Sequence, residues 1–383
     1  MLKFKLSSHA LEVLSQYKFF SNIQGVQQLN SGQVFESRLG KKIIYIPHSD
    51  IFITFRKICD IIYNDYLSKI PCNMSAVAYI EGKSYLNFIE PHRNNFFFLR
   101  LDIKNFFPSI TEALVKECFR DYFSEEPIND VIKQSHLDAF VNFVTLNITN
   151  SSVNDTFKNS SILPMGFPLS PIISNIIFRK IDIIIERLCV QSYITYTRYA
   201  DDLLFSSRGK VDMSLASFMK INSTYTAFIH TERFCDSIRK ILAVDGYKIN
   251  KTKTIQAKSI VSLNGYTIIG SNYSDVRGEI RVSNKKTKKI EKLLHELKKK
   301  ISDQAVYLKC YSNQIPVPKY SSKKEVFLNA FYKNQIDNKL SGYRAYLISM
   351  IKFDGEYDCF DSHALQKYKN LISQLDLALS KRK

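Results

Sequence analysis

A nearly unbroken apolar run spans Phe96–Ile103 and reads FFFLRLDI. A run of this kind is typical of a strand that is buried on both faces. It ends at Asp102, a carboxylate that needs a partner if it lies beside a buried strand. After a short aromatic turn, Ser109–Glu112 has the pattern of a capping box, which predicts a helix that runs to about Phe123.

Two further β-rich runs, Tyr193–Tyr199 and Leu203–Phe205, flank a turn whose tip is Ala200-Asp201-Asp202. This spacing predicts a short hairpin. The turn lacks the Gly or Asn that tight hairpin turns prefer. The hairpin therefore presents two adjacent carboxylates at its tip.

Most of the remaining chain has helical periodicity. Ser170 is the predicted N-cap of one of these helices, and Pro171 is its first helical residue. The predicted helices lie at residues 10–14, 51–70, 131–144, 172–189, 215–244 and 283–300, and from 324 to the end. The other predicted elements are a strand at 41–47, a loop at 147–161 and a hairpin at 261–269 around Asn264-Gly265.

Length and composition predict a globular protein. The chain has 383 residues, of which 45% are hydrophobic, so it can bury a core in two or three structural units. The first residues show no signal-peptide pattern, and no apolar run approaches the ~20 residues needed to span a membrane. The seven cysteines are scattered and show no zinc-binding spacing. We therefore expect a soluble cytoplasmic protein with reduced thiols and no membrane partner.

The formal net charge of +18 favours a polyanionic partner such as nucleic acid. Much of this charge lies in the predicted helix at 283–300, which includes Lys285, Lys288 and Lys289. Its basic side is either a solvated face or a surface that follows phosphate groups.

The two acids of the hairpin turn have two interpretations. Adjacent carboxylates repel each other, so Asp201 and Asp202 mark either a solvated turn or a site for a divalent cation. A cation site needs a further ligand from elsewhere in the chain, and Asp102 at the end of its strand supplies that third carboxylate.

Three motifs follow one another in a fixed order: LRLDIKNFFPSI at 99–110, LPMGFPLSPIISN at 163–175 and YTRYADDLLFS at 196–206. With these motifs the sequence resembles the bacterial reverse transcriptases of the retron, group II intron and defence-associated lineage. The resemblance extends from about residue 41 to residue 346.

The resemblance implies an α+β right-hand polymerase with fingers, a palm that contains an antiparallel sheet, and a helical thumb. We expect an N-terminal segment and fingers at 1–95, a palm at 96–275 with a fingers insertion at about 124–163, and a helical thumb and C-terminal region at 276–383.

It also implies nucleotidyl transfer with two Mg²⁺ ions. Mg²⁺ prefers oxygen ligands and keeps waters and substrate phosphates in its shell, so few protein carboxylates are needed. Asp102 and Asp201 are expected to bridge the metals. Asp202 is the less direct third acid, and the backbone carbonyl of Ile103 would complete the shell.

Other roles follow from the family position by position. Phe107 stands where the family has an aromatic steric gate against a ribose 2′-hydroxyl, although an ordinary core Phe is the alternative. Lys253 would protonate the departing pyrophosphate, and Asn264-Gly265 would belong to the primer grip. The expected contacts to the incoming nucleotide are Lys42 (in place of the usual Arg), Arg56, Asn105 and Phe106.

The chain also departs from the family pattern. Where relatives read Pro-Gln-Gly, this sequence has Pro164-Met165-Gly166. A Met side chain offers a flexible thioether in place of an amide, so we expect altered nucleotide handling or a narrow template repertoire. The segment that ends at His92 only loosely resembles a retron element, and His92 is equally well explained as a core or loop histidine.

The expected function is RNA-directed DNA synthesis from dNTPs, on a cognate non-coding RNA in anti-phage defence. The expected partners are this RNA, the DNA product and either an accessory protein or a second copy of the chain. The alternatives are an intron-type mobility enzyme, a non-catalytic RNA-binding scaffold, and untemplated or protein-primed DNA synthesis.

Overall fold

The computed structural model describes residues 3–40, 42–208, 227–271, 276–299, 301–311 and 324–382. These residues form two compact units. The first contains the described residues within 1–88, 99–205 and 226–256, and the second contains those within 89–98, 206–225 and 257–383. The division into fingers, palm and thumb stays a prediction.

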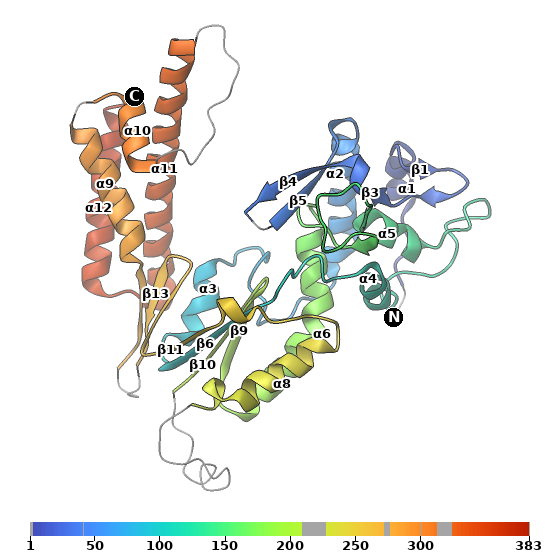
Figure 1. Cartoon of the computed structure of the whole chain (residues 1–383), viewed down its shortest axis with the longest axis horizontal. Helices are drawn as coiled ribbons and strands as arrows, with labels where there is room; N and C mark the ends of the chain where they lie inside the picture. Colours follow the sequence, from blue (N-terminus) through green and yellow to red (C-terminus); the bar gives the residue numbers. More distant parts are fainter. Residues whose placement is uncertain are drawn as a thin grey trace. The chain divides into compact units, whose positions relative to one another are not determined.

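The chain up to residue 148 contains α1 (Ser8–Ser15), β1 (Phe20–Ser21), β2 (Gly25–Val26), β3 (Leu29–Asn30), β4 (Val34–Leu39), β5 (Lys42–Pro47), α2 (Ser49–Asp65), α3 (Tyr85–Ile89), β6 (Phe97–Asp102), α4 (Glu112–Phe119), α5 (His136–Val144) and β7 (Leu146–Ile148). The next elements are β8 (Ser160–Ile162), α6 (Ser170–Gln191), β9 (Thr195–Tyr199), β10 (Asp202–Ser207), α8 (Glu232–Ala243) and β11 (Ile255–Lys258). Short 3₁₀ helices lie at Ser31–Gln33, Leu67–Lys69, Glu90–His92, Phe228–His230 and Lys251–Lys253. Figure 1 shows these elements in the colours of the sequence.

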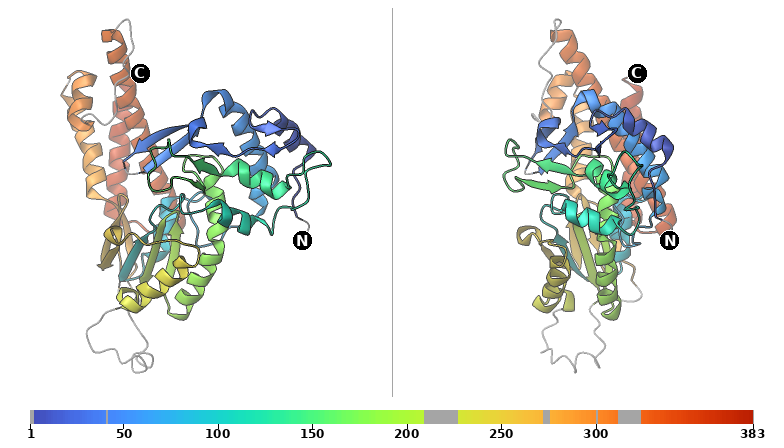
Figure 2. Two further views of the ribbon diagram at one scale, coloured as in Figure 1. Left: turned by 45° about the vertical axis from the view of Figure 1, so that its right-hand side comes forward. Right: turned by 90° about the vertical axis from the view of Figure 1, so that its right-hand side faces the viewer.

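A four-stranded sheet with the order β11-β6-β10-β9 carries the acidic residues. As predicted, β6 is buried along almost its whole length. Helix α6 packs against β9 and α8, and Figure 2 shows it running alongside the sheet. Phe205 of β10 stacks on Tyr196 of β9 with ring centroids 5.0 Å apart, and Phe234 of α8 meets Phe205 edge-on at 5.2 Å. These aromatic contacts fix the hairpin to the helical layer.

The second unit combines a three-stranded antiparallel sheet with a helical bundle. The sheet contains β12 (Ile260–Leu263), β13 (Tyr266–Ile269) and β14 (Glu279–Val282), and the helices are α9 (Asn284–Lys298), α10 (Asp303–Tyr311), α11 (Lys324–Tyr357) and α12 (Ser362–Ser380). Helices α9 and α12 pack against each other, as do α10 and α11 and also α11 and α12 (Figure 1). Arg93 donates to the carbonyls of Tyr357 (2.9 Å) and Asp358 (2.5 Å), so a cation caps the C-terminus of α11.

Most predicted elements are confirmed, with differences at their ends. The strand at 41–47 is β5, although residue 41 lies outside the described residues. The helix at 131–144 begins only at His136, after the N-cap Ser135. The helix at 215–244 falls partly outside the described residues, and its described part is α8. The polar segment after α1 forms strands that the apolar pattern did not predict, because β1 has only two residues and β4 is mostly exposed.

Two predicted helix caps were wrong. Helix α4 begins at Glu112 and is capped by Thr111, because the amide of Ser109 instead donates to the carbonyl of Asn105 and closes the aromatic turn. Helix α6 begins at Ser170 itself, so Ser170 is not an N-cap. Its hydroxyl donates instead to the carbonyl of Pro164 at 2.6 Å and stiffens the lead-in to the helix.

All seven cysteines are free thiols. None of the helices in the described ranges has the length and apolar character needed to cross a membrane.

His92 is a core histidine. Its side chain is fully buried, and its Nδ1 lies 2.7 Å from the hydroxyl of Ser206. Burial lowers the pKa of His92 to about 3, because the charged imidazolium loses its hydration there.

We therefore expect His92 to destabilise the fold in acid. The pKa of His92 is lower in the folded protein than in the unfolded chain. The free energy of unfolding is therefore unaffected by His92 protonation above about pH 6.5 and decreases as the pH falls from there towards 3. The free energy of unfolding should fall by ~1.4 kcal/mol per pH unit from this group alone. Urea unfolding of the wild type and His92→Gln between pH 7.5 and 5 measures the difference in slope. Parallel curves for the two proteins would contradict the assignment.

Candidate active site

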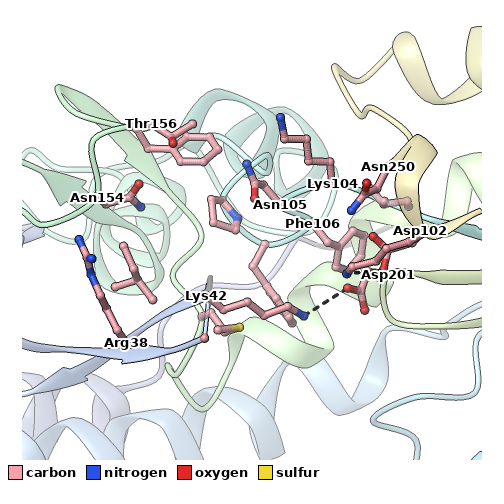
Figure 3. A pocket seen from close by; sticks show the side chains of 18 of the residues that line it. Arg38, Lys42, Asp102, Lys104, Asn105, Phe106, Asn154, Thr156, Asp201 and Asn250 are labelled. Carbon is pink, nitrogen blue, oxygen red and sulfur yellow. Dashed lines mark hydrogen bonds and ion pairs between the residues drawn. The ribbon is translucent and has the colours of Figure 1, made fainter. Parts of the chain in front are cut away.

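The hairpin turn and the end of β6 bring two carboxylates together. Ala200 adopts a left-handed backbone conformation with φ of 54°, which supplies the turn that Gly or Asn would otherwise form. The amide of Ile103 donates to the carbonyl of Asp201 at 2.9 Å, which ties the turn to the strand that carries Asp102. Asp102 and Asp201 consequently line one pocket, and Figure 3 shows them side by side.

Each of these carboxylates is paired with a lysine from a different segment. Lys253 Nζ lies 2.9 Å from Asp102 Oδ1, and Lys42 Nζ lies 3.3 Å from Asp201 Oδ2. The two lysine side chains are about half exposed, whereas the Asp102 side chain is buried. Positive charge from two distant parts of the chain thus offsets the repulsion between the acids.

Asp202 has a different environment. It does not line the pocket, and its Oδ1 accepts from Arg100 Nε at 3.0 Å and Nη2 at 2.5 Å. Both side chains of this ion pair are mostly buried. Burial raises the pKa of Asp202, and the charge of Arg100 acts against that rise. Asp202 thus anchors the hairpin to β6.

The pocket has a volume of about 660 Å³. Nine of the predicted site residues line it: Lys42, Asp102, Ile103, Asn105, Phe106, Phe107, Met165, Asp201 and Lys253. Arg56 does not, and it lies on the exposed side of α2. Gly166 is next to the lining residue Met165 and packs against the backbone of β5.

Other polar residues of the pocket were not predicted. These are Arg38, Lys104, Asn154, Asp155, Thr156, Asn250 and Thr252. Figure 3 shows Arg38, Asn154 and Thr156 at the end of the pocket away from Asp102 and Asp201. Asn154 reaches this wall because its side chain donates to the Tyr45 hydroxyl at 2.8 Å. Such a tertiary contact leaves no local signal in a polar loop sequence.

The aromatic turn after β6 divides its two Phe residues between core and pocket. Phe106 is buried and stacks on Tyr247 with ring centroids 5.9 Å apart. Phe107 is half-buried, lines the pocket and lies 6.3 Å from the ring of Tyr79. Asn105 begins the turn in a left-handed conformation with φ of 52°. Phe106 thus anchors the turn while Phe107 faces the pocket.

The remaining predicted residues belong to the second unit. Asn264 and Gly265 form the tip of the β12–β13 hairpin, and both have positive φ values, as a tight turn requires. Lys285, Lys288 and Lys289 are exposed on α9, whose buried side contains Ile290, Leu293 and Leu294.

The model of the family "Reverse transcriptase (RNA-dependent DNA polymerase)" matches residues 48–268. The chain therefore belongs to the reverse transcriptase family, which confirms the predicted α+β polymerase fold.

Similar proteins include reverse transcriptases from bacterial retrons, which confirms the retron-type resemblance. The Retron Ec83 reverse transcriptase of Escherichia coli is 34% identical over 160 residues, which cover 41% of this chain and 46% of that protein. The Retron Ec73 enzyme of the same species is 25% identical over 229 residues, covering 55% of this chain and 65% of the relative. The Retron Mx162 enzyme of Myxococcus xanthus is 29% identical over 145 residues, which cover 38% of this chain and 29% of the relative. The chain thus spans less than two thirds of each of these relatives.

Among solved structures, the telomerase from Candida albicans in complex with a fragment of telomeric RNA is 12% identical. The match covers 93% of this chain and 62% of the telomerase chain, with a TM-score of 0.42.

Gly166 provides a test of how the pocket is built. Its φ is +112°, and an added Cβ would lie 2.5 Å from the carbonyl oxygen of Tyr45. A hydrogen bond from the Tyr45 amide to the carbonyl of Met165, 2.8 Å long, holds these two segments together and opposes a shift of Tyr45. Gly82 also has a positive φ, of +73°, but an added Cβ there would meet nothing within 4 Å.

We expect Gly82→Ala to lose about 1–2 kcal/mol of unfolding free energy from backbone strain alone. Gly166→Ala should lose at least twice as much, because a φ of +112° lies further outside the left-handed region and the added Cβ also clashes with backbone atoms. Urea unfolding of both variants measures the difference. Equal losses would show that β5 does not press on the Met165-Gly166 segment.

Proposed function

We propose that this protein is an RNA-directed DNA polymerase that adds dNTPs to a primer on an RNA template. The observation that carries this proposal is the pairing of Asp102 and Asp201 with Lys253 and Lys42 in one pocket. Membership of the reverse transcriptase family supports the same reaction. A solvated surface turn does not explain why the Asp102 side chain is buried and ion-paired.

The donor set fits divalent cations. Asp102 and Asp201 are hard oxygen ligands, and the two lysine ammonium groups now stand beside them as positive charges. Mg²⁺ takes further oxygen ligands from substrate phosphates and water, so two protein carboxylates are a sufficient start for its shell. Asp102, Asp201 and the Ile103 carbonyl would hold two Mg²⁺ ions, with Asp202 acting indirectly. When bound, these ions would activate the primer 3′-hydroxyl and steady the leaving pyrophosphate.

The residues around the acids would handle the triphosphate. Lys42 and Lys253 are long cations that can leave their carboxylates and pair with phosphate oxygens when a nucleotide enters. Arg38, which lines the same pocket, offers a guanidinium fork for the same purpose. Lys253, whose Nζ donates to Asp102, would also protonate the departing pyrophosphate.

The apolar residues of the pocket would select the nucleotide. Phe107 faces the pocket and would exclude a ribose 2′-hydroxyl, so deoxynucleotides are favoured. Met165 would contact the nucleotide through its thioether, without the hydrogen bonds of an amide. The enzyme would therefore show altered nucleotide handling or a narrow template repertoire.

The template would be a cognate non-coding RNA, and the biological role would be anti-phage defence. The similarity to retron reverse transcriptases supports a retron-type enzyme, and from this we infer such a template. The net charge of +18 and the exposed lysines of α9 suit a polyanionic partner.

Primer extension on a DNA-primed RNA template tests the proposal. We expect Asp201→Asn to abolish extension by the purified protein, because it removes a carboxylate from the pocket, while RNA binding and thermal stability stay close to those of the wild type. Asp102→Asn should behave in the same way.

The matched control for charge removal is Asp155→Asn, which removes an exposed carboxylate from the lining of the same pocket and should retain most of the extension. If the wild type binds RNA but fails to extend a primer with all four dNTPs and Mg²⁺, the polymerase proposal fails and a scaffold role gains support.

A further inference from the structure

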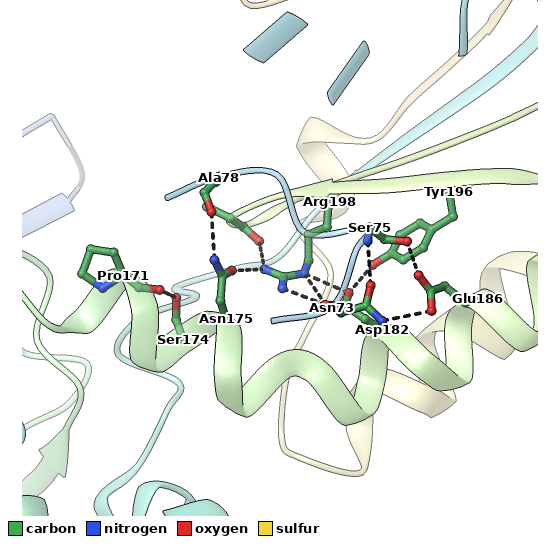
Figure 4. A network of polar contacts seen from close by, with 11 residues as sticks. Asn73, Ser75, Ala78, Pro171, Ser174, Asn175, Asp182, Glu186, Tyr196 and Arg198 are labelled. Atoms are coloured by element: carbon green, nitrogen blue, oxygen red, sulfur yellow. Dashed lines mark hydrogen bonds and ion pairs between the residues drawn. The ribbon is translucent and has the colours of Figure 1, made fainter. Parts of the chain in front are cut away.

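A buried polar network lies below the acidic turn, between α6 and β9. Arg198 of β9 and Asp182 of α6 are both fully buried, with Arg198 Nε 2.9 Å from Asp182 Oδ1 and Nη2 2.8 Å from Oδ2. Asp182 also accepts from the Tyr196 hydroxyl at 2.7 Å. Figure 4 shows these side chains converging from the helix and the strand. The pair is neutral in sum and well hydrogen-bonded, which is what a buried ion pair needs.

One arm of the network holds the turn that carries Asp201. Arg198 Nη1 donates to the carbonyl of Ala200 at 3.3 Å and to Oδ1 of Asn175 at 3.1 Å. Ala200 is the residue with the left-handed φ of 54°. A non-glycine residue in this conformation is strained, and it persists only where its surroundings hold it.

The other arm holds a second strained residue. Asn175 Nδ2 donates to the carbonyl of Ala78 at 2.8 Å. The next residue is Tyr79, which has a left-handed φ of 64° and whose ring lies 6.3 Å from that of Phe107. About half of Tyr79 is exposed to solvent. The burial of the other half, together with the negative charge of Asp201, raises the pKa of the Tyr79 hydroxyl to about 12.

The main chain completes the connection. The amide of Arg198 donates to the carbonyl of Ser75 at 2.7 Å, and the amide of Val77 donates to the carbonyl of Arg198 at 2.8 Å. The segment before Tyr79 therefore runs beside β9 as an additional edge. A shift of the segment from Ser75 to Tyr79 would therefore also move Arg198, the residue whose guanidinium holds the carbonyl of Ala200.

We propose that Asn175 is a positioning residue that couples two walls of the pocket. One end of its amide acts through Arg198 on the Ala200-Asp201 turn, and the other end acts through Ala78 on Tyr79 and the neighbouring Phe107. The inference rests on the proposed polymerase function and deepens it. It assigns to this fully buried amide an effect on both the rate of nucleotide addition and the choice of sugar.

The test compares Asn175→Ala with Ser75→Ala. Ser75 belongs to the same network, but its hydroxyl donates only to Glu186 and does not contact the side chain of Arg198. Each variant removes one polar side-chain group: Asn175 belongs to α6, and Ser75 hydrogen-bonds to Glu186 of the same helix. We expect Asn175→Ala to lower kcat for dNTP addition by roughly 10- to 100-fold, the effect of small misplacements of reacting groups. The KM for primer–template should change by less than about twofold, since substrate binding elsewhere is untouched.

The ratio of dNTP to rNTP incorporation should also fall in Asn175→Ala, because Phe107 loses its fixed neighbour. Ser75→Ala should retain the wild-type kcat and ratio when both variants are compared at equal folded fractions. If Asn175→Ala matches Ser75→Ala in both readouts, the network is merely structural and the inference is wrong.

A second variant serves if Asn175→Ala fails to fold. Asn175→Ser adds no charge, and its single short hydroxyl cannot serve both Arg198 and Ala78, so kcat and the dNTP-to-rNTP ratio should both fall. Loss of kcat with an unchanged ratio would overturn the coupling. A wild-type protein that does not extend primers at all would refute the proposed function instead, which distinguishes the two failures.

Discussion

The structure depends on how the charge of closely spaced carboxylates is balanced. Asp102 ends β6, Asp202 begins the neighbouring strand β10, and Asp201 precedes it in the hairpin turn. Two like charges about 4 Å apart repel by several kcal/mol at the dielectric of a protein surface. The chain offsets this with one cation per acid, each from a different position: Lys253, Lys42 and Arg100. The lysine pairs are half-exposed and can open for a substrate. The Arg100–Asp202 pair is mostly buried and anchors the hairpin to β6. The adjacent acids Asp201 and Asp202 therefore have different roles, one in the pocket and one in the sheet.

A second balance of charge lies beneath the first. The Arg198–Asp182 pair is closed to solvent, and the hydrogen bonds of Asn175 extend it to the backbone on both sides. Buried pairs of this kind contribute little net stability compared with apolar packing, but they define geometry. Here that geometry includes the strained residue that precedes Asp201. The pocket thus combines replaceable surface cations with a fixed interior.

The sequence predicted the parts of this arrangement that follow from local pattern. The apolar run before Asp102 and the turn at Asp201 were recognisable because strand periodicity and motif spacing are local. The wall that contains Asn154 was not predicted, because a polar loop acquires its position only through contact with Tyr45. Arg56 was expected to contact the nucleotide because of the family resemblance, yet it does not line the pocket and lies on the exposed side of α2. Pairings between distant segments therefore mark the limit of what one sequence predicts.

The most direct test of the central claim is thermal unfolding in the presence of Mg²⁺ and a dNTP analogue whose α,β-bridge cannot be cleaved. A ligand that binds only the folded state stabilises it by RT ln(1 + [L]/Kd), so at a fixed ligand concentration a tighter ligand raises the melting temperature further. If Asp102 and Asp201 hold the metal with the nucleotide, the two ligands together should stabilise the wild type more than the sum of each alone. This excess should disappear in Asp102→Asn. An equal excess in the wild type and in Asp102→Asn would contradict the account.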